Sequence, residues 1–181
     1  MKITHTPLKG CIVIEPDVFL DNRGYFMEAY KKKELDAALG YEINFSQDNQ
    51  TSSSRGVLRG LHFQKGNYAQ AKLVRVLHGA VLDVGVDLRK GSTTYGQYIS
   101  LKLTAENKKQ LFIPRGFAHG FVVLSATAVF SYKCDNYYNK ASESGIIYND
   151  PTLNIDWELP DEQLLLSEKD LQLPQFKSLK I

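Results

Sequence analysis

The chain of 181 residues suits one domain of ordinary size, and its 43% hydrophobic and 23% charged residues indicate a globular protein and exclude a disordered one. The net charge is +2, from 22 basic and 20 acidic residues, which is too balanced for a general nucleic-acid-binding protein. Residues 1–7 are polar and no apolar stretch approaches the length of a membrane span. We therefore expect a cytoplasmic protein without a membrane segment.

Short runs that favour strands, punctuated by Gly, Asn and Asp, fill most of the chain. The first part predicts one helix, at 31–39, which ends at Gly40. It also predicts polar turns at 21–24 and 52–54. The strands expected around these turns are 11–14, 25–30, 45–51 and 57–63.

The next part begins with two apolar runs, 72–77 and 81–88, which enclose His78 and Gly79 and predict a β-hairpin. Further strands are expected at 95–103, 110–113, 119–124, 129–134 and 146–148. After residue 150 the alternation loosens, and short helical turns at 161–166 and 167–171 are expected to pack against the body. About ten short strands at close spacing predict an all-β antiparallel sandwich or barrel.

Polar side chains interrupt the apolar strand near residue 60, where Arg59, His62 and Gln64 stand among hydrophobic neighbours. A lone histidine in a strand is usually structural. Other titratable groups stand on or beside three further predicted strands: Lys72, His119 and Tyr132. Groups on separate strands converge inside a small barrel or at its mouth, and burying them without use would destabilise the fold. The pattern therefore predicts a ligand site in the barrel.

The alternation of a strand gives a test of this prediction. His62 and Gln64 share one face, whereas Arg59 belongs to the other face of a regular strand. If Arg59 and His62 both meet one ligand, the alternation must break between them. Gly60 is the natural place for a β-bulge.

Three further polar or reactive residues lie in apolar runs. Cys11 and Cys134 lack the spacing of a metal or redox motif and are interpreted as reduced core thiols. Asp83 interrupts the run 81–86, so an inward carboxylate needs a partner. We expect a structural role for it, with Lys72 or Arg75 on the adjoining strand as that partner.

Seven segments, in this order and spacing, resemble the signature of the dTDP-4-dehydrorhamnose 3,5-epimerase family. They are DNRGYFME at 21–28, QDN at 47–49, RGLHFQ at 59–64, KLVR at 72–75, PRGFAHGF at 114–121, NYY at 136–138 and LSEKD at 166–170. The resemblance runs from about residue 10 to residue 170. It implies a cupin-type jelly roll and a homodimer. We then expect one domain over 1–181, with a barrel core at about 45–148 and both ends of the chain packed on it.

The resemblance also implies a reaction: epimerisation at C3 and C5 of dTDP-4-dehydro-6-deoxy-D-glucose to dTDP-4-dehydro-L-rhamnose, for dTDP-rhamnose and cell-surface polysaccharide synthesis. Removing a proton beside a ketone needs a base, a group for the enolate oxygen and an acid on the opposite face. By resemblance these are His62 with Asp170 as its carboxylate partner, Lys72 and Tyr132. Metal-binding cupins carry a His-x-His pair, whereas Gln64 stands at its second position here, so no metal and no cofactor are expected.

By the same resemblance, Arg59 and His119 position the substrate, and Arg59 faces the diphosphate because its planar fork matches phosphate oxygens. Other family binding positions, for the nucleotide or its phosphates, are Arg23, Glu28, Gln47, Asn49, Glu143 and Lys169. Candidates that flank the sugar or the base are Phe19, Phe26 and Tyr138. The segment with Arg23 and Glu28 tends to cross to the partner subunit in this family, which implies a composite site.

Four alternatives stay open at this stage. One is an epimerase that acts at a single carbon, C3 or C5, of a related nucleotide-linked 4-keto sugar. Another is a sugar-nucleotide ketoisomerase, whose family resembles the chain less over 59–64. The third is a non-catalytic sugar-nucleotide-binding cupin, and the last is a metal-dependent cupin.

Overall fold

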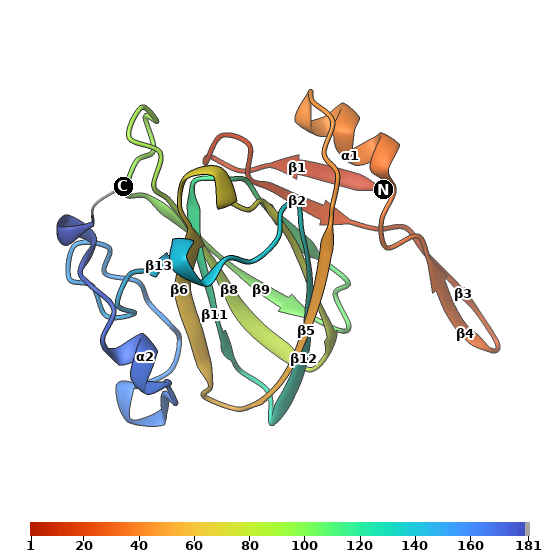
Figure 1. Cartoon of the computed structure of the whole chain (residues 1–181). Helices are drawn as coiled ribbons and strands as arrows, with labels where there is room; N and C mark the ends of the chain where they lie inside the picture. The colour runs from red at the N-terminus through yellow and green to blue at the C-terminus, as the bar shows by residue number, and fades with distance from the viewer. Residues whose placement is uncertain (180–181) are drawn as a thin grey trace.

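The computed structural model describes residues 1–179, and antiparallel strands dominate it (Figure 1). Six strands form one sheet in the order β1-β2-β10-β7-β12-β5. Their bounds in that order are Lys2–His5, Ile12–Glu15, Gln110–Ile113, Lys72–His78, Thr127–Cys134 and Gln47–Ser54. Five strands form the second sheet in the order β13-β6-β11-β8-β9. These run over Glu143–Gly145, Leu58–Gln64, Phe117–Val123, Ala80–Asp87 and Tyr98–Thr104.

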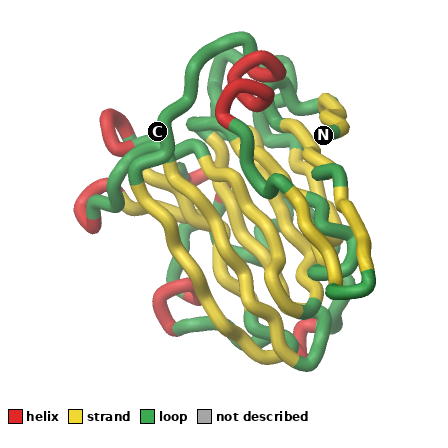
Figure 2. The backbone as a smooth tube through the Cα atoms, turned by 90° about the vertical axis from the view of Figure 1, so that its right-hand side faces the viewer, coloured by secondary structure: helices red, strands yellow, loops and turns green. Residues whose placement is uncertain are grey.

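A separate hairpin, β3 (Val18–Asp21) and β4 (Gly24–Met27), projects from the body (Figure 1). The helices are short and lie at the periphery of the strands, as Figure 2 shows. They are α1 (Lys32–Leu39), α2 (Glu168–Leu171) and the 3₁₀ turns Gly66–Tyr68, Lys140–Ser142, Asp161–Gln163 and Phe176–Ser178. No helix of the described part of the chain is long and apolar enough to cross a membrane.

Three apolar clusters follow from the alternation of the strands. Inward residues of both sheets, such as Val74, Phe121 and Phe130, form the core between the sheets. Outward residues of the six-stranded sheet pack against α1 around Leu35, and those of the five-stranded sheet pack under the C-terminal segment around Trp157. Both sheets are therefore covered on their outer faces, and polar inward positions face the space between them.

The expected all-β antiparallel architecture is confirmed, and the helix that ends at Gly40 is present, with Gly40 in the left-handed conformation at φ 77°. The predicted hairpin of 72–77 and 81–88 is wrong. β7 and β8 lie in different sheets, and the turn at Gly79 carries the chain from one sheet to the other. A side chain at Gly79 would lie 2.1 Å from the Thr127 carbonyl oxygen, so the corner requires glycine.

The predicted turn at 52–54 is also wrong. β5 continues through these serines to Ser54, which pairs with Thr127 of β12, and the chain turns at 55–56 instead. Residues 146–148 form no strand, although Ile146 exchanges backbone hydrogen bonds with Leu61. The sequence pattern did not predict three short strands, namely β1, β3 and β13.

Candidate functional site

The inward polar residues surround a cavity of about 490 Å³ between the two sheets. An adjoining cavity of about 310 Å³ shares three side chains with it, His62, Lys72 and Tyr132. His62 comes from β6 of the five-stranded sheet, whereas Lys72 and Tyr132 come from β7 and β12 of the six-stranded sheet. The convergence expected from the sequence is therefore present, and the three groups stand where the two cavities meet.

A β-bulge in β6 brings Arg59 and His62 to the same cavity. His119 of β11 lies opposite His62, but Phe121, two residues on, lies opposite Arg59, so β6 contains one extra residue there. Gly60 has φ 140°, and an added Cβ would lie 2.5 Å from the Gly120 Cα. The bulge predicted at Gly60 is confirmed, and the close approach of the two strands admits no side chain at this point.

His62 and Asp170 form a close pair at the cavity wall, with 2.6 Å between His62 Nε2 and Asp170 Oδ1. The His62 side chain is 28% exposed and that of Asp170 only 6%. Asp170 belongs to α2, which begins after Ser167, and Ser167 Oγ accepts a hydrogen bond from the Asp170 backbone N–H. Burial alone would raise the pKa of Asp170, but the hydrogen bonds from His62 and Ser167 hold it below its ordinary value. Asp170 is therefore a carboxylate at neutral pH.

Lys72 and Tyr132 lie together on the opposite wall, with the Lys72 ammonium 5.7 Å from the centre of the Tyr132 ring. Burial lowers the pKa of Lys72 and raises that of Tyr132. No carboxylate of residues 1–179 lies within ion-pair distance of the Lys72 ammonium. The pair therefore offers the lysine Nζ and a neutral phenol O–H as hydrogen-bond donors to whatever occupies the cavity.

A second histidine–carboxylate pair is more deeply buried. His119 Nε2 lies 2.8 Å from Asp83 Oδ1, and the side chains are 6% and 0% exposed. The expected partners of Asp83, Lys72 and Arg75, are therefore wrong, because the neighbouring strand β11 places His119 against it. Burial lowers the pKa of His119, so this imidazole is neutral at neutral pH.

Seven of the expected binding residues line the two cavities. Arg59, His119 and Lys169 line the larger one. Gln47, Asn49, Tyr138 and Glu143 line the smaller one. Glu143 links two elements at the rim, since it accepts a hydrogen bond from the Tyr138 hydroxyl at 2.8 Å and pairs with the Lys169 ammonium at 2.5 Å. This contact ties α2, which carries both Lys169 and Asp170, to the barrel.

Four expected residues lie away from these cavities within the single chain. Phe19 and Phe26 stack on each other in the projecting hairpin β3–β4, and both are exposed (Figure 1). Arg23, in the turn of this hairpin, pairs with Asp21, and Glu28, just after it, pairs with Lys31.

Several cavity residues were absent from the sequence prediction. Thr51 and Phe121 line the larger cavity, as do Leu165, Leu166 and Ser167 of the C-terminal segment, while Gln70 lines the smaller one. The sequence of β5 shows no alternation, because all of its residues from Gln47 to Ser54 are polar. The C-terminal residues also lack a signal, because a parallel bridge between Leu165 and Val57 brings them to the barrel from far along the chain.

No group of three His, Cys, Asp or Glu side chains within residues 1–179 is arranged to hold a metal ion. Gln64 occupies the second position of the cupin His-x-His pair and accepts a hydrogen bond from the Asn139 backbone N–H. Cys11 and Cys134 are both buried and free, and burial raises their thiol pKa values to about 12 and about 11. Protonated thiols of this kind fit core packing.

Comparison with known proteins points to one sequence family. The sequence model of the family described as dTDP-4-dehydrorhamnose 3,5-epimerase matches residues 5–178. An enzyme of that name from Pseudomonas aeruginosa is 52% identical over 172 residues, which are 95% of this chain and 94% of the relative. The crystal structure of the enzyme from Elizabethkingia anophelis has a TM-score of 0.95 at 58% identity and covers 98% of this chain and 97% of its own.

A third similar protein was solved with a ligand. It is dTDP-6-deoxy-D-glucose-3,5-epimerase from Legionella pneumophila, in complex with dTDP-4-keto-L-rhamnose. It is 47% identical, has a TM-score of 0.94, and the match covers 99% of this chain and 94% of that one.

Proposed function

This chain belongs to the dTDP-4-dehydrorhamnose 3,5-epimerase family. On that basis we propose a role for each residue of its site. The chain is an isomerase of the cupin-type jelly-roll fold. Its reaction is the epimerisation of dTDP-4-dehydro-6-deoxy-D-glucose at C3 and C5 to dTDP-4-dehydro-L-rhamnose, in dTDP-rhamnose synthesis. The roles of individual residues, the single domain over 1–181, the homodimer and the cytoplasmic location are our proposals.

The observation that carries the proposal is the placement of His62 and Tyr132 on opposite walls of one cavity. Inverting a carbon by proton transfer requires removal of the proton from one face and its return to the other. A sugar ring bound between the two sheets has His62 on one face and Tyr132 on the other. The histidine removes the proton, and the tyrosine delivers one.

Asp170 supports the first step. As a carboxylate it accepts the hydrogen bond of His62 Nε2–H, which leaves Nδ1 with the lone pair that takes the proton. The imidazolium that forms is then stabilised by the negative charge 2.6 Å away. We propose this pair as the general base of the reaction.

Lys72 supplies the charge for the intermediate. Removing the proton beside the ketone moves negative charge to the ketone oxygen, and a sheltered ammonium stabilises that charge by about 3 kcal/mol. C3 and C5 both neighbour the ketone carbon, so one cation can serve both inversions. Arg59, Lys169, His119 and the residues of the smaller cavity then bind the rest of the dTDP-linked sugar.

We propose that the projecting hairpin completes the site of a partner subunit. Four hydrophobic side chains of β3 and β4 are more than half exposed: Phe19, Leu20, Tyr25 and Phe26. Arg23 and Glu28 lie in or beside this hairpin and away from the cavities of their own subunit. Mixing inactive Arg23→Ala and His62→Ala subunits tests this arrangement, since a mixed dimer would regain one intact site and measurable activity. A monomer in size-exclusion chromatography, or mixed subunits that stay inactive, would contradict it.

The function itself is tested by product analysis in deuterated water with dTDP-4-dehydro-6-deoxyglucose. We expect deuterium at both C3 and C5 and the L-rhamno product. Deuterium at one carbon alone would favour the single-centre epimerase instead. Tight binding of the nucleotide sugar without any exchange would favour the non-catalytic cupin.

A further inference from the structure

The inner face of β5 carries a row of polar side chains that points between the two sheets. Gln47, Asn49, Thr51 and Ser53 occupy alternate positions of this strand, and all four are less exposed than the residues between them. The first two line the smaller cavity and Thr51 lines the larger one. Ser53, at the end of the row, is only 9% exposed.

Ser53 is bound to Arg59 across the turn between β5 and β6. Its Oγ accepts hydrogen bonds from both Nε and Nη2 of the guanidinium, each at 3.2 Å. Two bonds to one oxygen fix the plane of the guanidinium, and the remaining N–H groups of Nη1 and Nη2 stay available to a ligand. Arg59 lines the larger cavity together with His62, Lys72 and Tyr132.

Arg59 has a hydroxyl as its hydrogen-bond partner, whereas three other arginines are each held by a carboxylate. Arg23 pairs with Asp21, Arg89 with Asp87 and Arg115 with Asp135. No carboxylate of residues 1–179 lies within 4.0 Å of the Arg59 guanidinium. A neutral acceptor therefore holds Arg59 in place while its positive charge stays unneutralised and faces the cavity.

We propose that Ser53 is a positioning residue, which aims the charged fork of Arg59 at the diphosphate of the substrate. This inference rests on the proposed role of Arg59 in the function given above. It assigns Ser53 to substrate binding and not to the proton transfers, because its oxygen reaches the substrate only through Arg59. Loss of the hydroxyl leaves the charge but frees the guanidinium to adopt other rotamers, which weakens a geometry-dependent bidentate contact.

The test compares four variants: Ser53→Ala, Arg59→Ala, the double variant, and Ser52→Ala as the matched control. Ser52 is the exposed neighbour on the opposite face of β5. For Ser53→Ala we expect KM to rise about tenfold while kcat stays within about twofold of the parent. For Arg59→Ala we expect a rise of about a hundredfold. The double variant should resemble Arg59→Ala, because Ser53 has nothing left to position.

Binding measurements separate the diphosphate from the base. By calorimetry, Ser53→Ala should bind dTDP about tenfold more weakly and thymidine, which lacks the phosphates, as tightly as the parent. If KM is unchanged in Ser53→Ala but raised in Arg59→Ala, the role of Ser53 is overturned while that of Arg59 stands. Unchanged KM in Arg59→Ala would overturn the assignment of Arg59 and this inference with it. Equal losses for dTDP and thymidine, or additive effects in the double variant, would show a general distortion of the site and also overturn it.

Discussion

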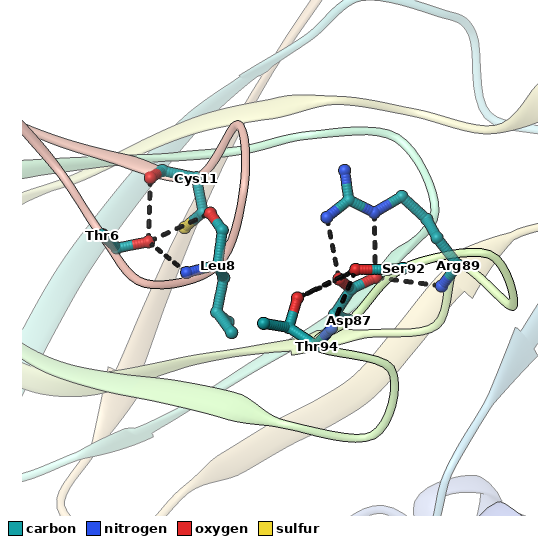
Figure 3. Close-up of polar contacts among 7 residues, drawn as sticks. All are labelled: Thr6, Leu8, Cys11, Asp87, Arg89, Ser92 and Thr94. Carbon is teal, nitrogen blue, oxygen red and sulfur yellow. Dashed lines mark hydrogen bonds and ion pairs between the residues drawn. The ribbon is translucent and has the colours of Figure 1, made fainter.

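Asp83 and Asp87 lie four residues apart on the inner face of β8, and both side chains are fully buried. Asp87 accepts hydrogen bonds from Nε and Nη2 of Arg89 and from the hydroxyls of Ser92 and Thr94, all between 2.6 and 2.9 Å (Figure 3). Asp83 has one oxygen on His119, and its other oxygen, Oδ2, has no hydrogen-bond partner among the described residues.

The difference in hydrogen bonding between Asp87 and Asp83 indicates a different role for each carboxylate. Asp87 is saturated by a guanidinium and hydroxyls of the loop that follows β8, so it closes that loop and stays charged. Burial would raise its pKa, but the bonds from Arg89, Ser92 and Thr94 outweigh it and lower the pKa to about 2. Asp83 is left partly unsatisfied beside the cavity, where it holds His119 against the substrate space. Incomplete satisfaction of a buried polar group destabilises a fold and is typical of functional positions.

The largest expected effect is a loss of activity on substitution of a residue that lines the cavity. His62→Ala should lower kcat by on the order of 10³-fold, because it removes the general base, and should lower the thermal midpoint only modestly, because the Asp170 carboxylate that loses its partner lines the cavity. Steady-state assays and calorimetric unfolding check the two statements. An enzyme that keeps a tenth of the parent kcat would contradict the assignment of His62.

Asp87→Asn should produce the opposite pattern. It leaves the half-buried Arg89 guanidinium without its carboxylate and the hydroxyls of Ser92 and Thr94 without their charged acceptor, and we expect a loss of about 3 kcal/mol of unfolding free energy. The kcat of the folded fraction should be unchanged, since Asp87 lines neither cavity of the site. Denaturant unfolding and active-site titration measure these quantities. A lower kcat at unchanged stability would reverse the roles assigned to the two carboxylates.

Acid pH should remove the contribution of Asp87 to stability and so narrow the difference between the parent and Asp87→Asn. The folded pKa of Asp87 lies below its unfolded value, so its stabilisation is present above about pH 4 and is lost as the pH falls toward 2. The parent should lose about 2 kcal/mol more than Asp87→Asn over this window. Unfolding curves of both proteins at a series of pH values check the difference, and parallel losses would contradict it.

Asp83→Asn should have the smallest effect. An amide at this position can still hydrogen-bond His119, so we expect kcat/KM to fall about tenfold and stability to change by less than about 1 kcal/mol. The measurement is a kinetic comparison with the parent at neutral pH. A loss of stability as large as that of Asp87→Asn would show that both carboxylates are structural.

Much of this arrangement could be predicted from the sequence. Alternation and turn residues indicated most strands of the barrel, and the faces of Arg59 and His62 required the bulge at Gly60 that is present. The predicted hairpin of 72–88 failed for a physical reason. A glycine turn between apolar runs looks alike whether the chain folds back within a sheet or crosses to the facing sheet.

Contacts between residues far apart in the chain could not be predicted from the sequence pattern. Asp83 and His119 are separated by 36 residues, and only the pairing of β8 with β11 brings them together. The row on β5 was missed at Ser53 because a run of serines is typical of a turn, whereas the pairing with β12 keeps these residues in the strand. The contact of Asp170 with His62 was expected only from family resemblance, since residues 108 positions apart carry no local signal.

The central claim, that His62 and Tyr132 act on opposite faces of the sugar, is tested most directly with Tyr132→Phe in deuterated water. This variant keeps the ring and removes only the proton donor. We expect solvent deuterium to enter C3 or C5 of the recovered substrate, because His62 still removes and returns protons on its own face, while formation of the L-rhamno product is largely lost. Inverted product formed at the parent rate would contradict the claim.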